Sequence, residues 1–325
     1  MNKYDSQQNQ IIKRTMLLIV TLFLTVLVVS CKPKVDTGAI ELINQAYEVL
    51  TLEFQEGDTM DSVTGDFRLP LFVSEYPDVA LLWSSGAESI IKPQGLFAVI
   101  NRPQEDTSVG LTATLSYKKE SKDKIFSINV SGYTDYEFTG YYESLSGLLM
   151  DEFTVELSSM IKTKGRATGT TAQVRQIDNY EGQNYNIYTG FEAYGNREHV
   201  WPQSHLGVIK DDLHNLRAAN SQVNSTRGNK FFVDNPLGGS WKVIGNGFYP
   251  GEDHIGDVAR IILYIYIRYE LNIQLVGQLD LFLMWHEMDP VSPFEVSRNN
   301  KIYSIQSNRN PFIDYPDLVD IMFNN

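Results

Sequence analysis

Two segments, NREHVWPQSH at residues 196–205 and DLHNLRAANSQVNSTRGN at residues 212–229, decide the fold expected for the C-terminal half of this 325-residue chain. They hold three of the five histidines, His199, His205 and His214, together with Glu, Asp, Asn and Arg. These side chains bind hard cations or phosphate, and a histidine beside a cation can take a proton from water near neutral pH. The window therefore indicates a metal-dependent phosphodiester site, with a polar loop carrying structural histidines as the alternative.

The charge balance of the chain leaves room for a polyanionic substrate at this window. The whole chain has 27 Lys and Arg against 40 Asp and Glu, a net charge of −13, which argues against a broadly basic surface for nucleic acid. Residues 197–230, in contrast, contain five basic and three acidic residues. A cation bound by one of these acids would make the window more positive still. We therefore expect modest non-specific affinity and a strong dependence on the metal.

The spacing of four residues indicates how they could meet. Glu198 and His199 are neighbours, and neighbours on a strand point to opposite faces, so both can reach one ion and its water only where the strand ends. Pro202 is consistent with such an end. Asn224 and Arg227 are three residues apart and share one face of a helix. An amide oxygen for a metal and a guanidinium for phosphate would then project together.

Both segments resemble the bacterial endonuclease I family, which comprises secreted or periplasmic nucleases with a His-Me finger (ββα-metal) site. The segments RNNKI at 298–302 and QSNRNPFID at 306–314 resemble the closing part of the same family, so the resemblance covers about residues 140–320. It implies that His199 is the general base and that Glu198, just before it, is a metal ligand.

The same resemblance implies the second metal ligand, the substrate and the products. The family's second ligand is an asparagine in a Val-Asn pair three residues before an arginine, which corresponds to Asn224, with Arg227 as a catalytic contact to phosphate. Mg²⁺ is the expected cation, with Mn²⁺ or Ca²⁺ as alternatives. DNA, together with RNA, is the expected substrate, and the products are expected to carry 5′-phosphates.

One departure from the family leaves an arginine unassigned. Some members insert a long loop with a phosphate-binding arginine between the histidine strand and the Asp-Leu-His strand, whereas only about residues 205–210 separate them here. Arg197, Arg217 and Arg227 are the candidates to replace it. The residues expected to bind phosphate or to support the site are therefore Arg197, His214, Arg217 and Asn229. His214 is expected to act by orienting its neighbours.

The remaining histidines are expected to have structural roles. A zinc site on His199 and His205 is disfavoured, because no carboxylate or cysteine completes the ligand set at short spacing. His254 and His286 are expected to be structural or surface residues. Arg309 is expected to pin the C-terminal segment to the core.

The N-terminal residues are typical of a secreted lipoprotein. Residues 1–30 begin polar, carry three basic residues and then turn apolar over 16–29, which is the pattern of a secretory signal peptide. The run ends in Val-Val-Ser-Cys, which resembles a bacterial lipobox, so Cys31 is expected to carry a diacylglycerol anchor to the membrane. The alternative is an uncleaved anchor helix with an incidental cysteine. Both interpretations put the rest of the chain outside the cytoplasm.

A second domain is expected between the signal and the nuclease-like region. After a tether at 31–44, residues 45–134 contain short, evenly spaced apolar runs that predict a small β-sandwich and resemble the atypical immunoglobulin-like modules of bacterial surface proteins. The alternation over 111–117 predicts a strand with one wet face. Residues 138–325 form the nuclease-like domain. Strands are expected at 67–73, 80–83, 96–100, 109–117 and 124–130, and helices at 40–52, 142–161, 258–270 and 273–287.

The expected fold class is α+β, with a ββα-metal nuclease domain in a largely helical surround and a small N-terminal β-sandwich. The sequence favours an extracellular, membrane-anchored endonuclease with little sequence preference, and it implies no protein partner. The alternative is a surface adhesin or nucleic-acid-binding lipoprotein whose nuclease-like domain is inactive. The joint presence of Glu198, His199 and Asn224 argues against that alternative.

Overall fold

The structure, a computed structural model, describes residues 36–323 apart from 168 and 208–210. The expected signal peptide and Cys31 lie outside the described residues. Within the described part, no helix combines the length and the apolar character that a membrane span requires.

The chain divides into two compact units. Unit 1 takes the residues up to Ile100 together with Ser108–Ile128, and unit 2 takes Asn101–Thr107 and the residues from Asn129 onward. The domain bounds expected from the sequence, 45–134 and 138–325, stay a prediction. The buried ring of Tyr133 belongs to the core of unit 2.

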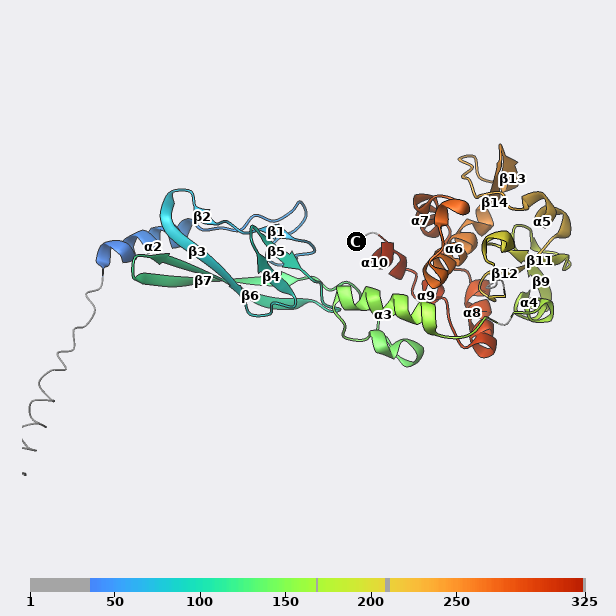
Figure 1. Ribbon diagram of the computed structural model, residues 1–325, viewed down its shortest axis with the longest axis horizontal. Coiled ribbons are helices and arrows are strands. Elements are labelled where there is room, and N and C mark those ends of the chain that lie inside the picture. Colours follow the sequence, from blue (N-terminus) through green and yellow to red (C-terminus); the bar gives the residue numbers. More distant parts are fainter. Residues whose placement is uncertain (1–35, 168, 208–210, 324–325) are drawn as a thin grey trace, which may run out of the picture. The chain divides into compact units, whose positions relative to one another are not determined.

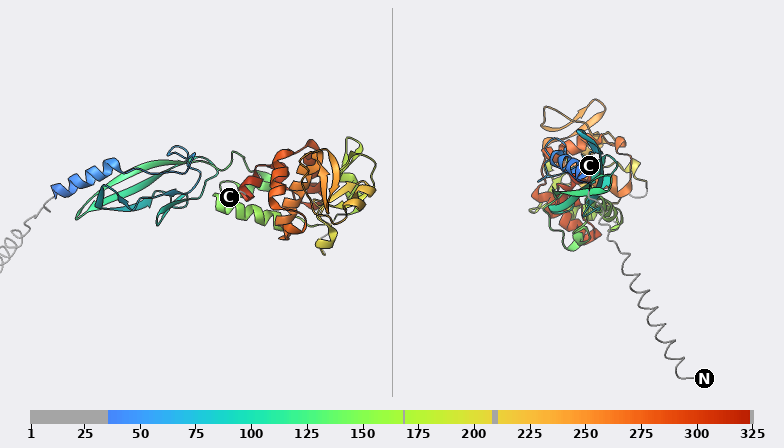
Figure 2. Two further views of the ribbon diagram at one scale, coloured as in Figure 1. Left: turned by 90° about the horizontal axis from the view of Figure 1, so that it is seen from above. Right: turned by 90° about the vertical axis from the view of Figure 1, so that its left-hand side faces the viewer.

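The described part of unit 1 contains one helix and two small β-sheets, in line with its short apolar runs (Figures 1 and 2). Its elements are α2 (Thr37–Val49), β1 (Phe67–Arg68), β2 (Phe72–Val73), β3 (Tyr76–Ser85), β4 (Ile91–Gln94), β5 (Phe97–Ile100), β6 (Thr107–Tyr117) and β7 (Glu120–Val130). One sheet has the order β1-β5-β4 and the other β2-β3-β6-β7. The expected one-sided strand is confirmed, because Leu111, Ala113 and Leu115 on β6 are buried while their neighbours are partly exposed.

Helix α2 lies at one end of the long strands β3, β6 and β7 (Figures 1 and 2). It begins three residues before the predicted start because the carboxylate of Asp36 accepts a hydrogen bond from the N–H of Ala39 at 3.1 Å. At the other end, Lys124 Nζ on β7 donates to the carbonyls of Tyr47 at 2.6 Å and Leu50 at 2.8 Å. A cation at the C-terminal carbonyls stabilises the helix end and joins it to the sheet.

In the described part of unit 2, helices surround three small antiparallel sheets, so the predicted α+β class is confirmed. The sheets have the orders β10-β9-β8, β11-β12 and β13-β14. The elements are η1 (Gly140–Leu145), α3 (Met150–Thr163), α4 (Thr171–Ile177), β8 (Asn179–Tyr180), β9 (Gln183–Asn186), β10 (Gly190–Phe191), β11 (Asn196–His199), η2 (Gln203–His205), β12 (Leu216–Ala219), α5 (Ser221–Arg227), β13 (Ser240–Ile244), β14 (Gly247–Gly251), η3 (Glu252–His254), α6 (Ile255–Tyr269), η4 (Ile273–Leu275), α7 (Leu279–Met288), α8 (Pro293–Gln306), α9 (Pro311–Asp314) and α10 (Leu318–Phe323).

Helix α6 forms the centre of unit 2, with α7 packed along it (Figure 1). The sequence analysis expected a buried helix at 258–270, and almost every side chain of α6 is buried. Its two arginines are paired rather than exposed. Arg260 Nε lies 2.7 Å from Glu295, and Arg268 Nε lies 3.0 Å from Asp212.

Two predicted helices are each interrupted at a glycine. The segment 142–161 is divided between η1 and α3, with Gly147 at φ +72° between them. The segment 273–287 is divided between η4 and α7, and a Cβ on Gly277 would lie 2.6 Å from the ring of Phe282. Apolar periodicity predicted one long helix in each case because it does not register a break of three or four residues.

One predicted strand needs correction, and one helix was not predicted. The strand expected through Asp-Leu-His-Asn-Leu begins only at Leu216, and residues 211–215 form a turn in which Asp212 Oδ1 accepts from the N–H of His214 at 2.9 Å. Helix α8 was not predicted. Its buried face is largely polar, so it lacks the apolar stripe that marks a helix in a sequence.

Candidate active site

The two quoted segments form a hairpin followed by a helix. β11 pairs with β12 in antiparallel register, with Glu198 opposite Arg217 and His199 opposite Leu216. α5 follows β12 directly and begins where Asn220 accepts hydrogen bonds from the next N–H groups of the helix. This β-β-α order brings the strand that carries His199 beside the helix that carries Asn224.

The strand ends at His199, as the sequence analysis required. Asn215 Nδ2 donates to the carbonyl of Trp201 at 3.0 Å, and the N–H of Trp201 donates to Asn215 Oδ1 at 2.7 Å. Trp201 is fully buried, and Pro202 follows it. The chain is therefore anchored immediately beyond His199, so the strand end that carries Glu198 and His199 has a fixed course.

Glu198 is buried and has three donors around its carboxylate. Tyr188 Oη donates to Oε1 at 3.0 Å, and Arg227 Nη1 lies 3.4 Å from the same atom. The N–H of His199 donates to Oε2 at 3.1 Å. Burial raises the pKa of Glu198, and Arg227, Tyr188 and the N–H of His199 oppose that rise. A buried carboxylate of this kind gains from a nearby cation, which favours its charged form.

Asn224 is oriented so that its amide oxygen is left for another partner. Its Nδ2 donates to Asn196 Oδ1 at 2.8 Å and to the carbonyl of Arg197 at 3.3 Å. A backbone carbonyl can only accept, so the nitrogen of the amide has to face it. The oxygen is thereby turned away from these two contacts. Glu198 and Asn224 together offer hard oxygen donors, which suit Mg²⁺, Mn²⁺ or Ca²⁺.

The three arginine candidates have different surroundings. Arg227 is 1% exposed, and it donates to the carbonyls of His199 at 3.2 Å and Val200 at 2.6 Å. Arg217 is fully buried and lies 2.9 Å from Asp257. Both differ from the open placement that the expected phosphate contact requires. Arg197 is only half-buried, and as the second residue before His199 it lies on the same face of β11.

The other histidines belong to the interior or to short turns. Burial lowers the pKa of His214 to about 4, and its ring lies 4.5 Å from that of Tyr264, so it is a neutral core residue. Burial also lowers the pKa of His254 to about 4 and that of His286. Among the residues that the structure describes, no group of three or more His, Cys, Asp or Glu side chains is arranged to hold a metal.

Asn229 and Arg309 are the remaining residues that the sequence singled out. Asn229 is exposed just beyond the end of α5. Arg309 donates to Asp314 through Nε and Nη2, both at 2.6 Å, and this pair lies within the C-terminal segment itself. That Arg309 pins the segment to the core stays a prediction.

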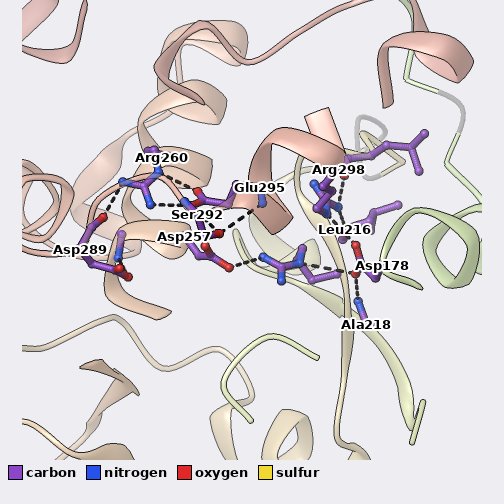
Figure 3. A network of polar contacts seen from close by, with 12 residues as sticks. Asp178, Leu216, Ala218, Asp257, Arg260, Asp289, Ser292, Glu295 and Arg298 are labelled. Atoms are coloured by element: carbon purple, nitrogen blue, oxygen red, sulfur yellow. Dashed lines mark hydrogen bonds and ion pairs between the residues drawn. The ribbon is translucent and has the colours of Figure 1, made fainter. Parts of the chain in front are cut away.

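A network of buried charges contacts the backbone of β12 (Figure 3). Asp178 accepts from Arg298 Nε at 2.7 Å and from the N–H of Ala218 on β12. Arg298 also donates to the carbonyl of Leu213 at 2.7 Å and to that of Leu216. Because each charge is buried, any shift of β12 would leave one of them unpaired. The network therefore holds the position of β12, and through the ladder that of β11.

The sequence analysis missed Tyr188 and Asn196, which contact the expected metal ligands. Asn196 lies two residues before Glu198 and so shares its face of the strand, a signal that the sequence did offer. Tyr188 lies ten residues away and reaches Glu198 from the segment between β9 and β10. Nothing in its local pattern marks that contact.

Comparison with known proteins identifies the class to which this site belongs. Residues 115–317 match the model of the family described as Endonuclease I, and because this is more than half of the chain, the chain belongs to that family. Residues 43–132 match the family described as atrophied bacterial Ig domain. Both matches agree with the resemblances noted in the sequence.

Particular relatives carry nuclease names. The chain is 39% identical over 167 residues to the extracellular ribonuclease of Bacillus subtilis, covering 43% of this chain and 58% of that protein. It is 43% identical over 155 residues to the extracellular ribonuclease of Bacillus amyloliquefaciens, covering 38% and 52%. It is 30% identical over 129 residues to a periplasmic deoxyribonuclease of Aeromonas hydrophila, covering 37% and 54%. The chain thus spans about half the length of the curated relatives it matches.

Proposed function

We propose that this chain is a metal-dependent endonuclease that hydrolyses phosphodiester bonds of DNA, and also of RNA, with little sequence preference. Family membership supports the reaction class, and relatives with both ribonuclease and deoxyribonuclease names support the breadth of substrate. The observation that carries the proposal is the joint geometry at the end of β11. There the buried carboxylate of Glu198, the oriented amide of Asn224 and the strand-terminal His199 come from adjacent elements.

The donor chemistry of the site fits a divalent cation. Glu198 and Asn224 would be its protein ligands, and the cation would supply positive charge beside the scissile phosphate. Mg²⁺ suits a site of this kind, since it is bound by few protein oxygens and keeps several waters.

The chain's own residues then have distinct tasks. His199 takes a proton from the attacking water at an imidazole nitrogen, and the water attacks phosphorus in line with the leaving 3′-oxygen. This route gives 5′-phosphate products. Arg197 contacts phosphate oxygens from the face of β11 that it shares with His199. Arg227 acts as a positioning residue, because its guanidinium is already engaged with the carbonyls of His199 and Val200.

The proposed place of action is the outer face of the cell membrane. It rests on the lipobox-like sequence before Cys31, and the names of the relatives, extracellular or periplasmic, agree with export. Metabolic labelling with a fatty acid should mark the wild-type protein and not a Cys31→Ser variant. Equal labelling of both would contradict the anchor.

A plasmid-nicking assay with and without EDTA tests the proposed activity. We expect nicking of plasmid and degradation of RNA in Mg²⁺, both abolished by EDTA and restored by added metal. Binding of nucleic acid without any cleavage would instead support an inactive, adhesin-like protein.

Titration calorimetry tests the proposed ligands. Glu198→Ala and Asn224→Ala should bind Mn²⁺ at least about tenfold more weakly, which is the loss that even outer-shell changes produce. An exposed residue of the same helix provides the control, since Gln222→Ala should bind the ion as wild type does. If Glu198→Ala and Asn224→Ala bind Mn²⁺ like wild type, the ligand assignment is wrong.

A further inference from the structure

Tyr188 lies outside the two segments 196–205 and 212–229, and its side chain reaches Glu198 in the site. Its side chain is 3% exposed, and its hydroxyl donates to Glu198 Oε1 at 3.0 Å. The ring packs against that of Phe248 at 4.9 Å. A carboxylate can only accept, so the phenol is the donor in this bond.

The backbone of Tyr188 has an unusual conformation that serves this contact. Its φ is +75°, a region that bulky side chains rarely adopt. The preceding residue fixes the segment to β12, because the N–H of Ile187 donates to the carbonyl of Ala218 at 2.8 Å. A strained backbone of this kind persists only when its surroundings hold it, and such residues cluster at functional sites.

The two oxygens of Glu198 are not equivalent. Oε1 receives the hydroxyl of Tyr188 and lies 3.4 Å from Arg227 Nη1, whereas Oε2 receives, among the residues that the structure describes, the N–H of His199 alone. We propose that Tyr188 is a positioning residue that holds Oε1 and thereby presents Oε2 of Glu198 to the divalent cation. This inference rests on the proposed function, because it assumes that Glu198 is a metal ligand.

Unit 2 contains a second cluster with the same chemistry, which provides a matched control. Tyr142 Oη donates to Asp314 Oδ2 at 2.6 Å, and Arg309 pairs with the same carboxylate at 2.6 Å. Tyr142 is 4% exposed, about as buried as Tyr188. Tyr142→Phe therefore removes an equivalent hydrogen bond from a buried tyrosine that has no contact with Glu198.

The test compares Mn²⁺ binding by the full chain and its variants in titration calorimetry. Tyr188→Phe keeps the ring and removes only the hydroxyl. We expect its dissociation constant for Mn²⁺ to rise about 10–100-fold, as is typical for an outer-shell partner of a ligand. Tyr142→Phe should bind Mn²⁺ within about threefold of wild type, far below that outer-shell loss. Nicking by Tyr188→Phe should recover at raised Mn²⁺ with an unchanged KM for DNA.

A double-mutant comparison separates positioning from a general structural effect. If Tyr188 acts through Glu198, Tyr188→Phe should have no further effect in a Glu198→Ala background but its full effect in an Asn224→Ala background. Equal effects in both backgrounds would overturn the proposal, as would Mn²⁺ binding by Tyr188→Phe within threefold of wild type. A Tyr188→Phe protein that no longer folds would also overturn it, because the hydroxyl would then serve the fold.

Failure of the proposed function would give a different pattern. In that case Glu198→Ala would bind Mn²⁺ as wild type does, and the assignment of Tyr188 would fall with it. If Glu198→Ala loses binding while Tyr188→Phe retains it, the ligand stands and only the positioning role is overturned.

Discussion

The two units of this chain hold their charges in opposite ways. In the part that the structure describes, six ion pairs of unit 2 have both side chains no more than 6% exposed. The pair between Lys118 and Asp36 in unit 1 has side chains that are 54% and 41% exposed. Unit 1 is stabilised mainly by apolar burial, whereas unit 2 also buries charges that must find their partners.

The buried charges of unit 2 lie where precise geometry is needed. Asp178 follows α4 and contacts Arg298 on α8 (Figure 3). Arg217 on β12 lies 3.5 Å from the same aspartate, so one network joins elements that are distant in the sequence. Breaking any one pair leaves a buried charge unpaired, which disfavours alternative packings strongly. The difference between the units indicates that polar burial fixes the strand carrying the site.

The largest expected effect comes from the proposed general base. If unit 2 alone carries the activity, His199→Ala should lower the nicking rate of the full chain by roughly 10²–10⁴-fold while metal binding and folding persist. His205→Ala is the control, because the zinc alternative would require that residue as well. A nicking rate of His199→Ala within threefold of wild type would show that the base lies elsewhere. Equal losses in both variants would instead favour a paired histidine site.

The second effect tests the two kinds of charge directly. Asp178→Asn leaves Arg298 without its countercharge in the interior and leaves Arg217 with Asp257 alone, and we expect it to lower the free energy of unfolding by about 3–5 kcal/mol. Lys118→Ala breaks an exposed pair and should leave the denaturation midpoint unchanged. Chemical denaturation followed by tryptophan fluorescence measures both. Similar midpoints for the two variants would contradict the difference between the units.

A smaller effect concerns His254, a buried histidine of unit 2. Every histidine of the chain lies beyond residue 198, so unit 1 contributes none to this effect. Burial lowers the pKa of His254 to about 4, whereas an unfolded histidine has a pKa near 6.5. Between these values the unfolded state binds more protons, so His254 destabilises the fold increasingly as the pH falls from 6.5 to 4. His254→Phe cannot ionise and should gain stability relative to wild type by roughly 1.4 kcal/mol per pH unit across this window.

Comparing the two proteins at each pH isolates this residue, because the other titrating groups contribute to both. The measurement is the denaturation midpoint of wild type and variant from pH 7 to pH 4. A constant difference across the window would show that His254 is not held neutral by burial.

The sequence predicted the parts of this molecule that depend on local pattern. The end of β11 at His199 and the one-sided strand β6 follow from a chain breaker and from alternation, whereas the hairpin-helix order was implied by the family resemblance. The identity of the site residues came from a resemblance, since composition alone left a structural loop open. The role of each arginine could not be predicted, because Arg197, Arg217 and Arg227 differ only in how other elements surround them.

The missed features share one physical cause, which is that long-range polar burial leaves no local signature. Helix α8 was missed because it buries Glu295, Arg298 and other polar side chains where a stripe of apolar residues would be expected. Tyr188 was missed because its contact depends on a positive φ that tertiary packing imposes. Both belong to the unit with buried charges, so the part that was hardest to predict is the part that supports the site.

The smallest expected effect distinguishes an accessible arginine from a buried one. Each phosphate that a protein neutralises on duplex DNA adds about −0.9 to the slope of log affinity against log salt. If Arg197 contacts one phosphate, Arg197→Ala should make the slope shallower by about 0.9 and leave the denaturation midpoint almost unchanged. Arg227→Met should lower the denaturation midpoint and leave the slope unchanged, because the guanidinium of Arg227 is bound to carbonyls of the strand end and to the buried Glu198.

The measurement is duplex binding across a range of salt, made in a His199→Ala background so that the DNA stays intact. Few basic residues lie in the window around the site, so the wild-type slope itself should be shallow. If Arg197→Ala leaves the slope unchanged while Arg227→Met reduces it, then the buried arginine moves out to meet phosphate on binding, and the assignment of the two residues has to be exchanged. A steep wild-type slope would reveal a basic groove beyond residues 197–230, and the affinity would then not depend on these few contacts.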